Sequence, residues 1–201
     1  MIRLLILLVL IGSSDLVFGQ KNHRVTILSS EITIAGSTNV NSFECGLEQN
    51  AGHDVLKVDS RWTTSQLNFE GLELNYKVVD FDCGMQVMNQ DFREILHADQ
   101  YPRLVLKVQN IQIPNTNKEI ERLHVYSNVI VQIAGERRQF IVKDGRVINK
   151  SENELIFEGS RLMKISDFGI EPPTKYMGMV KVNDEITIQF SIRMRVDTLK
   201  E

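Results

Sequence analysis

The chain has 201 residues, of which 42% are hydrophobic and 24% are charged, and its formal net charge is −3. No composition shift or Pro/Ser-rich linker divides it, so we expect one domain large enough to bury a hydrophobic core. The slightly acidic balance argues against nucleic acid and anionic membrane surfaces as partners, because both attract basic patches.

The first nineteen residues predict a secretory signal peptide. A positive charge at Arg3 precedes an apolar run from Leu4 to Ile11, and Val17-Phe18-Gly19 fits cleavage before Gln20. The alternative is a transmembrane anchor, but spanning a bilayer takes about 20 apolar residues and this run has about eight. We therefore expect residues 1–19 to be removed. Residues 20–201 would then form a periplasmic or secreted domain without stable membrane insertion.

Strand candidates dominate the rest of the chain, because apolar and polar residues alternate with period two. Short runs of this kind lie at Val25–Leu28, Glu31–Ala35, Ser42–Glu48, Val55–Trp62, His124–Ile133 and Glu154–Lys164. Between Gln66 and Val78 the apolar parity changes, and a bulge or bend at Glu70-Gly71 would bring both sets of apolar residues to one face.

Cys45 and Cys83 are the two cysteines, and they lie in similar surroundings, Phe-Glu-Cys-Gly and Phe-Asp-Cys-Gly. An oxidising destination favours a disulfide between them, with two free buried thiols as the alternative. The four histidines are scattered, at His23, His53, His97 and His124. Their spacing indicates no metal site.

A short helix interrupts the strands between Asp91 and Ala98. Met88, Phe92, Ile95 and Leu96 form an apolar stripe at helical spacing. Asp91 is expected to cap the first turn with Glu94 reaching back to it. Tyr101-Pro102 follows, and proline disfavours helical backbone in the residue before it.

The second half of the chain returns to strands. Leu104, Leu106 and Val108 alternate with polar residues, and Ile186–Val196 shows the longest alternation in the sequence. Asp144-Gly145, within the run Phe140–Ile148, predicts a hairpin with a tight primed turn. Eight or more strands at these spacings are typical of a sandwich or a barrel.

The sequence shows no catalytic motif. It contains neither Gly-x-Ser-x-Gly nor a phosphate-cradling Gly-rich loop. The acidic pairs Asp80 with Asp82 and Asp197 with Glu201 are typical of solvated strand ends. We therefore predict that the protein is not an enzyme and uses no metal or cofactor. The remaining option is the space that the strands enclose, which is either filled by side chains or open to one apolar ligand.

Several segments in order resemble the YceI-like family of exported, lipocalin-like barrels that bind polyisoprenoid lipids. They are Ile34–Phe43, Met88–Leu96, Tyr101–Leu104, Val131–Arg138 and Asp167–Ile170. Together they span nearly the whole chain after the leader, and the ordered set is more specific than any one motif.

The chain departs from the family pattern at three points. Ser37-Thr38 stands where the family commonly has His-Ser, and Asn89-Gln90 where it has an Arg-Asp pair. Ile165 replaces the arginine two residues before Asp167-Phe168-Gly169. These differences indicate a divergent branch whose ligand can differ from a simple polyisoprenoid chain.

The resemblance implies an eight-stranded antiparallel lipocalin-like barrel with one short helix after the middle strands. It implies an exported carrier or reservoir whose barrel holds an amphiphilic isoprenoid, either a polyisoprenoid or a quinone-like lipid. We expect the lining to come from apolar residues of the alternating strands, each of which ordinary core packing explains equally well. The candidates are Phe69, Leu74, Tyr76, Leu104, Leu106, Val131, Phe140, Phe157, Ile188 and Phe190.

The alternative function is a cell-envelope protein–protein interaction module that uses the barrel as a scaffold. Its contacts would come from the loops at Gln109–Glu121 and Glu171–Tyr176, because surface loops tolerate variation and carry binding residues. The sequence leaves the oligomeric state open, with a homodimer as one option.

Overall fold

The computed structural model describes residues 22–50, 56–63, 65–114, 122–175 and 177–198. The predicted signal peptide, residues 1–19, and most of the loop 109–121 lie outside the described residues. Within them, α1 (Gln86–Ile95) is the one α-helix, and strands form nearly everything else.

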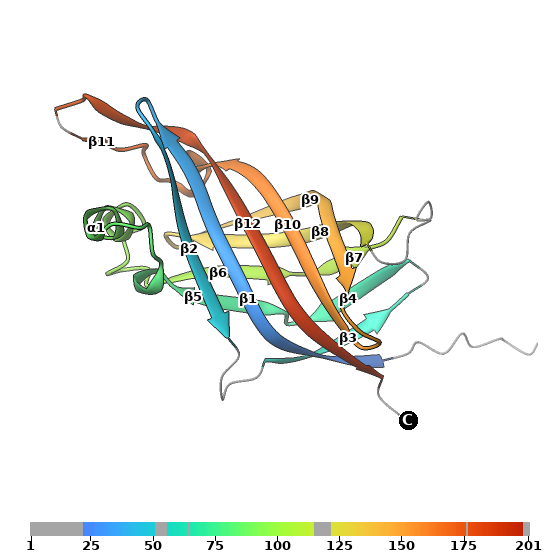
Figure 1. Ribbon diagram of the computed structural model, residues 1–201. Coiled ribbons are helices and arrows are strands. Elements are labelled where there is room, and N and C mark those ends of the chain that lie inside the picture. The colour runs from blue at the N-terminus through green and yellow to red at the C-terminus, as the bar shows by residue number, and fades with distance from the viewer. Residues whose placement is uncertain (1–21, 51–55, 64, 115–121, 176, 199–201) are drawn as a thin grey trace, which may run out of the picture.

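The strands follow one another along the chain with two short 3-10 helices, η1 and η2, between them (Figure 1). In order, the elements are β1 (Asn22–Thr38), β2 (Ser42–Asn50), β3 (Lys57–Trp62), β4 (Gln66–Glu70), β5 (Glu73–Lys77), η1 (Val78–Asp80), α1, β6 (Arg103–Val108), β7 (Asn110–Gln112), β8 (Arg122–Ile133), β9 (Glu136–Asn149), β10 (Glu154–Lys164), η2 (Ile165–Phe168), β11 (Thr174–Lys175) and β12 (Val180–Thr198).

A closed ring of eight antiparallel strands forms the half of the barrel away from α1. Starting from β1, the order is β3, β4, β7, β8, β9, β10 and β12, and β12 pairs with β1 to close the ring. The predicted eight-stranded antiparallel barrel with one short helix is confirmed. Closure leaves no free sheet edge in this half.

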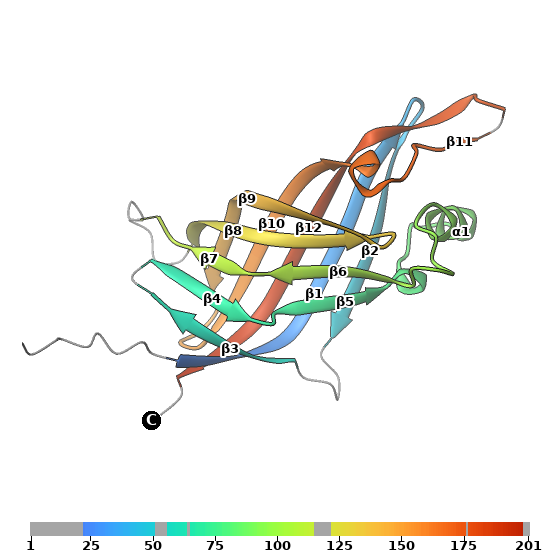
Figure 2. The same ribbon diagram turned by 180° about the vertical axis from the view of Figure 1, so that it is seen from behind.

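Two sheets separate towards α1, so that half of the barrel has two seams. One sheet contains β2, β1, β12 and β10, and the other contains β5, β6, β8 and β9 (Figures 1 and 2). The first seam lies between β2 and the segment after β5, and the second lies between β9 and β10. Different elements close the two seams.

The Cys45–Cys83 disulfide closes the first seam. Beside it, the backbones of Gly46 and Asp82 exchange two hydrogen bonds of 2.9 and 3.0 Å. The disulfide that the sequence favoured is therefore present in the structure, and it joins the segment between η1 and α1 to β2. At the second seam, η2 packs against β9, with the rings of Phe168 and Phe140 6.2 Å apart.

One hydrophobic core fills the middle of the barrel. The inward residues of β12 are buried at alternate positions from Ile186 to Met194, as the sequence pattern predicts. Leu67 and Phe69 of β4 are buried together with Leu72, Leu74 and Tyr76. The expected change of parity at Glu70-Gly71 is thus confirmed. It occurs at Gly71, which has a φ of 87° and lies between β4 and β5.

The predicted hairpin at Asp144-Gly145 is wrong, because β9 runs through both residues. The hairpin turn lies instead at Ala134 and Gly135, whose φ angles of 47° and 81° suit a type I′ turn. Gly145 lies at an irregularity in the pairing with β8, where a Cβ would meet the Val125 carbonyl oxygen at 2.9 Å. The glycine is needed there for close strand contact rather than for a turn.

The helix begins earlier than predicted. Its N-cap is Met85, so Asp91 lies inside the helix and does not cap it. The apolar stripe is confirmed, because Phe92 and Leu96 are buried and Met88 and Ile95 are half-buried against the core. The local capping signal was misleading because the preceding turn is fixed by contacts with Asp82 and the disulfide.

Replacing both cysteines, Cys45→Ala with Cys83→Ala, should lower the free energy of unfolding by about 4 kcal/mol. This is the loop-closure contribution of a crosslink whose cysteines lie 38 residues apart in sequence. Urea denaturation of the variant, compared with the wild type under reducing and non-reducing conditions, measures it. Equal midpoints for the variant and the oxidised wild type would contradict this role.

Candidate functional site

An apolar groove of about 250 Å³ opens at the α1 end of the barrel. The tip of the β1–β2 hairpin, the helix and the first residues of β12 form its walls (Figure 1). The lining residues are Thr38, Val40, Asn41, Phe43, Cys45, Met85, Val87, Met88, Asp91, Phe92, Ile95, Pro173, Val180 and Val182. We refer to this surface as the apolar groove.

Local hydrogen bonds fix the hairpin wall of the groove. The Thr38 hydroxyl donates to the Asn41 side-chain oxygen at 2.7 Å and accepts from the Val40 amide. The Asn39 side chain donates to the Met179 carbonyl at 2.9 Å and accepts from the Lys181 amide at 2.8 Å. The Asn39 side-chain amide therefore replaces a backbone peptide group in connecting the hairpin tip to the start of β12, since it both donates and accepts one hydrogen bond.

The helix wall is held to the disulfide by Asp82 and Asn89. The Asn89 side chain accepts from the Cys83 amide at 2.6 Å and donates to the Asp82 carboxylate at 3.2 Å. The Gly84 amide also donates to this carboxylate, and it is the larger cause of the lowered pKa of Asp82, ahead of Asn89. The hydrogen bonds of Asn89 to Asp82 and Cys83 thus fix the start of the helix against the first seam.

A small enclosed cavity of about 40 Å³ lies directly inside the groove. Four residues line both spaces, namely Phe43, Phe92, Ile95 and Val182. The remaining walls of the cavity come from the core and from η2, including Ile34, Ile165 and Phe168. The cavity therefore adjoins the groove and has η2 on its far side.

The rim of the groove exposes apolar side chains to water. Val40 is 67% exposed, and Met85 and Val87 are more than half exposed. A cluster of this kind at a concave surface is typical of a binding site. Among the helices of the described segments, none has the length and apolar character that a membrane crossing requires.

A second depression, of about 410 Å³, lies on the outer face of β1, β9, β10 and β12. Glu31, Asp144, Arg146 and Glu158 are among its lining residues, and Arg146 pairs with Glu158 at 3.3 Å. This surface consists mainly of solvated strand side chains and offers little apolar area. Within the described ranges, no group of three or more His, Cys, Asp or Glu side chains is arranged to hold a metal ion.

The ten residues that the sequence nominated as ligand lining all belong to the barrel interior. Nine of them are buried and Phe140 is half-buried against the same cluster. Phe157 and Phe190 pack edge to face with ring centroids 5.3 Å apart. None of the ten lines the apolar groove or the enclosed cavity. Their contact with a ligand stays a prediction, since any such ligand would have to enter the packed core.

Sequence reasoning missed the groove residues because they come from a hairpin tip, a helix and a strand start. Val40 and Val87 belong to no alternating or helical apolar pattern in the sequence, so nothing there marks them as binding residues. Only the fold brings them into one groove. Arg161 continues the inward set of β10 after Phe157 and Gly159, but it lines neither the groove nor the cavity.

Tyr76 carries the one polar side-chain atom among the ten predicted lining residues. Its side chain is fully buried, and its hydroxyl has no hydrogen-bond partner among the described residues. Burial raises the pKa of Tyr76 to about 12, and the nearby Ser30 hydroxyl lowers it by a smaller amount without reaching hydrogen-bond geometry. The phenol is therefore neutral throughout the physiological range.

Tyr76→Phe should raise the free energy of unfolding at pH 7 by about 1 kcal/mol, because it removes a buried hydroxyl without a partner. In the wild type, the phenol is neutral in both the folded and the unfolded chain below about pH 10, the pKa of an unfolded tyrosine, so its titration leaves the free energy of unfolding unchanged there. Because burial raises the folded-state pKa to about 12, the free energy of unfolding falls by about 3 kcal/mol as the pH rises from about 10 through about 12.

Urea denaturation between pH 7 and pH 11.5 should therefore show a smaller loss of stability for Tyr76→Phe than for the wild type. Tyr126→Phe, at an exposed position, is the control and should change neither value. A Tyr76→Phe protein that is clearly less stable at pH 7 would indicate a hydrogen bond to the phenol.

Comparisons of the sequence alone find no relative, since no family model and no curated protein matches the chain. Structural comparison does find proteins of similar fold. The chain is similar to BcnA of Burkholderia cenocepacia, with 16% identity, a TM-score of 0.52, and coverage of 82% of this chain and 95% of that one. A polyisoprenoid-binding domain of Saccharophagus degradans, implicated in plant cell wall breakdown, aligns with 10% identity, a TM-score of 0.56, and coverage of 86% and 97%.

A YceI protein of Campylobacter jejuni also aligns, over 66% of this chain and 74% of that one, with 16% identity and a TM-score of 0.48. The two fuller alignments establish the fold. The chain is a lipocalin-like barrel of the kind found in the polyisoprenoid-binding domain. The barrel fold that the sequence resemblance implied is thus confirmed.

Proposed function

We propose that the protein is a divergent YceI-like lipid-binding protein that holds the tail of an amphiphilic isoprenoid at the α1 end of its barrel. The observation that carries this proposal is the apolar groove with the enclosed cavity behind it, joined through Phe43, Phe92, Ile95 and Val182. The similarity in fold to a polyisoprenoid-binding domain supports it.

The energetics of such a site need little polar recognition. Each CH₂ group moved from water into an apolar site contributes about 0.8 kcal/mol, so a few isoprene units suffice for stable binding. The groove volume of about 250 Å³ is smaller than most small-molecule sites, which measure about 300–1,000 Å³. The groove therefore holds part of a tail, and a longer tail must extend along the exposed rim or move side chains of the core.

The predicted signal peptide fits a role outside the cytoplasm, and we propose that the protein acts there as a carrier or reservoir. An isoprenoid or quinone needs shelter from water to move between membranes. The barrel would supply it without spanning the bilayer.

Native mass spectrometry of protein purified from its own host should show an added mass that organic solvent removes. The intact mass of the stripped protein should correspond to residues 20–201. A uniformly ligand-free protein would count against a lipid-holding role, and a retained leader would count against export.

Ile95→Lys should weaken the binding of an isoprenoid alcohol such as farnesol at least tenfold, because it puts a charge where groove and cavity meet. Lysine suits this position, since it lies in the last turn of the helix. Ile141→Lys, on the exposed face of β9, is the matched control and should bind as the wild type does. Calorimetric titration measures both variants, and equal affinities would exclude the groove.

A second candidate function, the protein-interaction module, is favoured by the tip before β12. Met177 is fully exposed and Met179 is 67% exposed, on either side of Gly178. Methionines adapt to varied apolar partners, which makes such surfaces useful for protein binding.

Met177→Ser with Met179→Ser should abolish recovery of one stoichiometric partner from the host envelope while leaving farnesol binding intact. Val79→Ser, another exposed apolar position, is the control. Loss of farnesol binding in the double variant would instead assign these methionines to the lipid site.

A further inference from the structure

Two hairpins meet at the α1 end of the barrel and form one projection (Figures 1 and 2). The tip of the β1–β2 hairpin lies beside the first residues of β12, where the Asn39 backbone amide donates to the Lys181 carbonyl at 3.0 Å. We refer to residues 36–43 and 177–183 together as the finger. It forms one edge of the apolar groove, because Val40 belongs to both.

The finger exposes three large apolar side chains to water. Met177 is fully exposed, and Val40 and Met179 are each 67% exposed. The two methionines line neither the groove nor the enclosed cavity, so they lie outside the proposed ligand site. Clustered apolar side chains on a protruding surface typically mark a contact with a membrane or with another protein.

Backbone and side-chain polar groups at the tip of the finger bond to one another. The four backbone amides from Thr38 to Asn41 all donate to acceptors within the finger. The Asn39 side chain makes two hydrogen bonds to the start of β12, and the Asn183 side chain donates to the Ser37 hydroxyl at 2.8 Å. Polar groups that are already paired cost little to move from water into an apolar medium, whereas unpaired ones cost several kcal/mol.

The charge of the finger is positive, although the chain as a whole has a net charge of −3. The exposed Lys181 is its one charged residue, and Lys175 of the adjoining β11 adds a second cation. The first carboxylate along β12 is Asp184, which accepts two hydrogen bonds from Ser166. Asp91, which lines the groove, belongs to the helix and lies outside the finger. Overall composition argued against an anionic membrane surface, but the local charge at the finger is suited to one.

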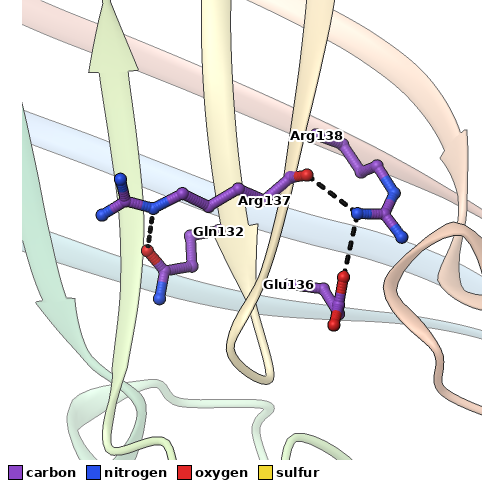
Figure 3. Close-up of polar contacts among 4 residues, drawn as sticks. All are labelled: Gln132, Glu136, Arg137 and Arg138. Carbon is purple, nitrogen blue, oxygen red and sulfur yellow. Dashed lines mark hydrogen bonds and ion pairs between the residues drawn. The ribbon is translucent and has the colours of Figure 1, made fainter.

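The β8–β9 hairpin also turns in the half of the barrel near α1, but its surface is charged. Figure 3 shows the Arg138 guanidinium bonded to the Glu136 carboxylate at 2.9 Å and to the Arg137 carbonyl at 2.8 Å. The Arg137 side chain donates to Gln132 at 2.6 Å. Exposed charges of this kind stay hydrated, so the apolar character is specific to the finger and is not shared by this hairpin.

We propose that the finger docks on the surface of a membrane that contains anionic phospholipids, with Met177 and Met179 among the acyl chains and Lys181 at the headgroups. The contact is peripheral, since only the tip of the finger enters the bilayer. The inference rests on the proposed lipid-binding function. Docking places Val40, and with it the mouth of the groove, at the bilayer, so an apolar tail can move between membrane and groove without crossing water.

A protein partner is the other contact that such a surface can make. Protein interfaces usually contain about one hydrogen bond per 100–200 Å², so they use donors and acceptors at the contact surface. The tip of the finger has already paired its backbone amides and the Asn39 side chain internally. This pairing favours the bilayer, whose acyl chains supply no hydrogen bonds.

Co-sedimentation of the purified protein with lipid vesicles tests the docking. The wild type should bind vesicles of phosphatidylcholine mixed with phosphatidylglycerol, and it should bind pure phosphatidylcholine vesicles more weakly. Met177→Ser with Met179→Ser should weaken binding to the mixed vesicles at least tenfold, because burial of apolar side chains of this size contributes that much. Ile141→Ser, at an exposed position on β9, is the matched control and should bind as the wild type does.

Two further variants test the charge and the depth of the contact. Lys181→Gln should weaken binding to the mixed vesicles about fivefold and leave binding to phosphatidylcholine unchanged, whereas Lys57→Gln, at an exposed position on β3, should change neither. In Met177→Trp, brominated phospholipid should quench the new tryptophan. The wild type should show no such quenching, because its single tryptophan, Trp62, belongs to β3 in the half of the barrel away from α1.

All variants should melt as cooperatively as the wild type and bind farnesol within twofold of its affinity. Equal vesicle binding by the wild type and the double methionine variant would overturn the docking, and loss of a protein partner by that variant alone would then assign the finger to protein contact. A wild type that binds farnesol but no vesicles would also overturn the docking and leave the proposed function intact. A wild type that binds vesicles but not farnesol would instead refute the proposed function.

Discussion

The pairing of β1 with β12 closes the barrel, and the arrangement of every other strand depends on it. The ladder runs from His23 opposite Thr198 to Thr38 opposite Val182. It joins the first and last strands of the described chain, so the sheet has no free edges in the half away from α1. Closure also sets the inward direction of each strand. One face of every strand then contributes to a single core, which is the main source of stability in a domain of this size.

The half of the barrel near α1 follows a different principle, because its two sheets do not meet. Covalent and local contacts replace strand pairing there, with the Cys45–Cys83 disulfide at one seam and η2 at the other. These closures use fewer backbone hydrogen bonds than a strand pair does. They leave an apolar groove beside the helix. The candidate site therefore lies where the barrel is least regular, while its middle is filled by side chains.

Much of the fold was predictable from the sequence, and the reasons lie in particular residues. The alternation from Ile186 to Val196 and the change of parity at Gly71 depend on local pattern, and both predictions are confirmed. The hairpin at Asp144-Gly145 was wrong because an Asp-Gly pair is equally compatible with a strand that passes close to its neighbour. The site was less predictable. Periodicity marks Leu106 and Phe157 as inward, but it does not distinguish packed core from ligand contact.

The sequence by itself determined the class of fold, the inward and outward faces of the long strands, the apolar stripe of the helix and the resemblance to YceI-like barrels. The faces of the strands and the stripe of the helix follow from spacing within single elements, whereas the class of fold and the resemblance follow from the order of segments along the chain. The tertiary structure decided which interior positions are filled, where the barrel opens, and that Val40, Met88 and Val182 share one groove. It also decided that the inward Arg161 lies over the Phe140 ring, with its guanidinium carbon 5.9 Å from the ring centre. These facts depend on contacts between residues far apart in the chain, and the physical interactions that set them exist only once the barrel is closed.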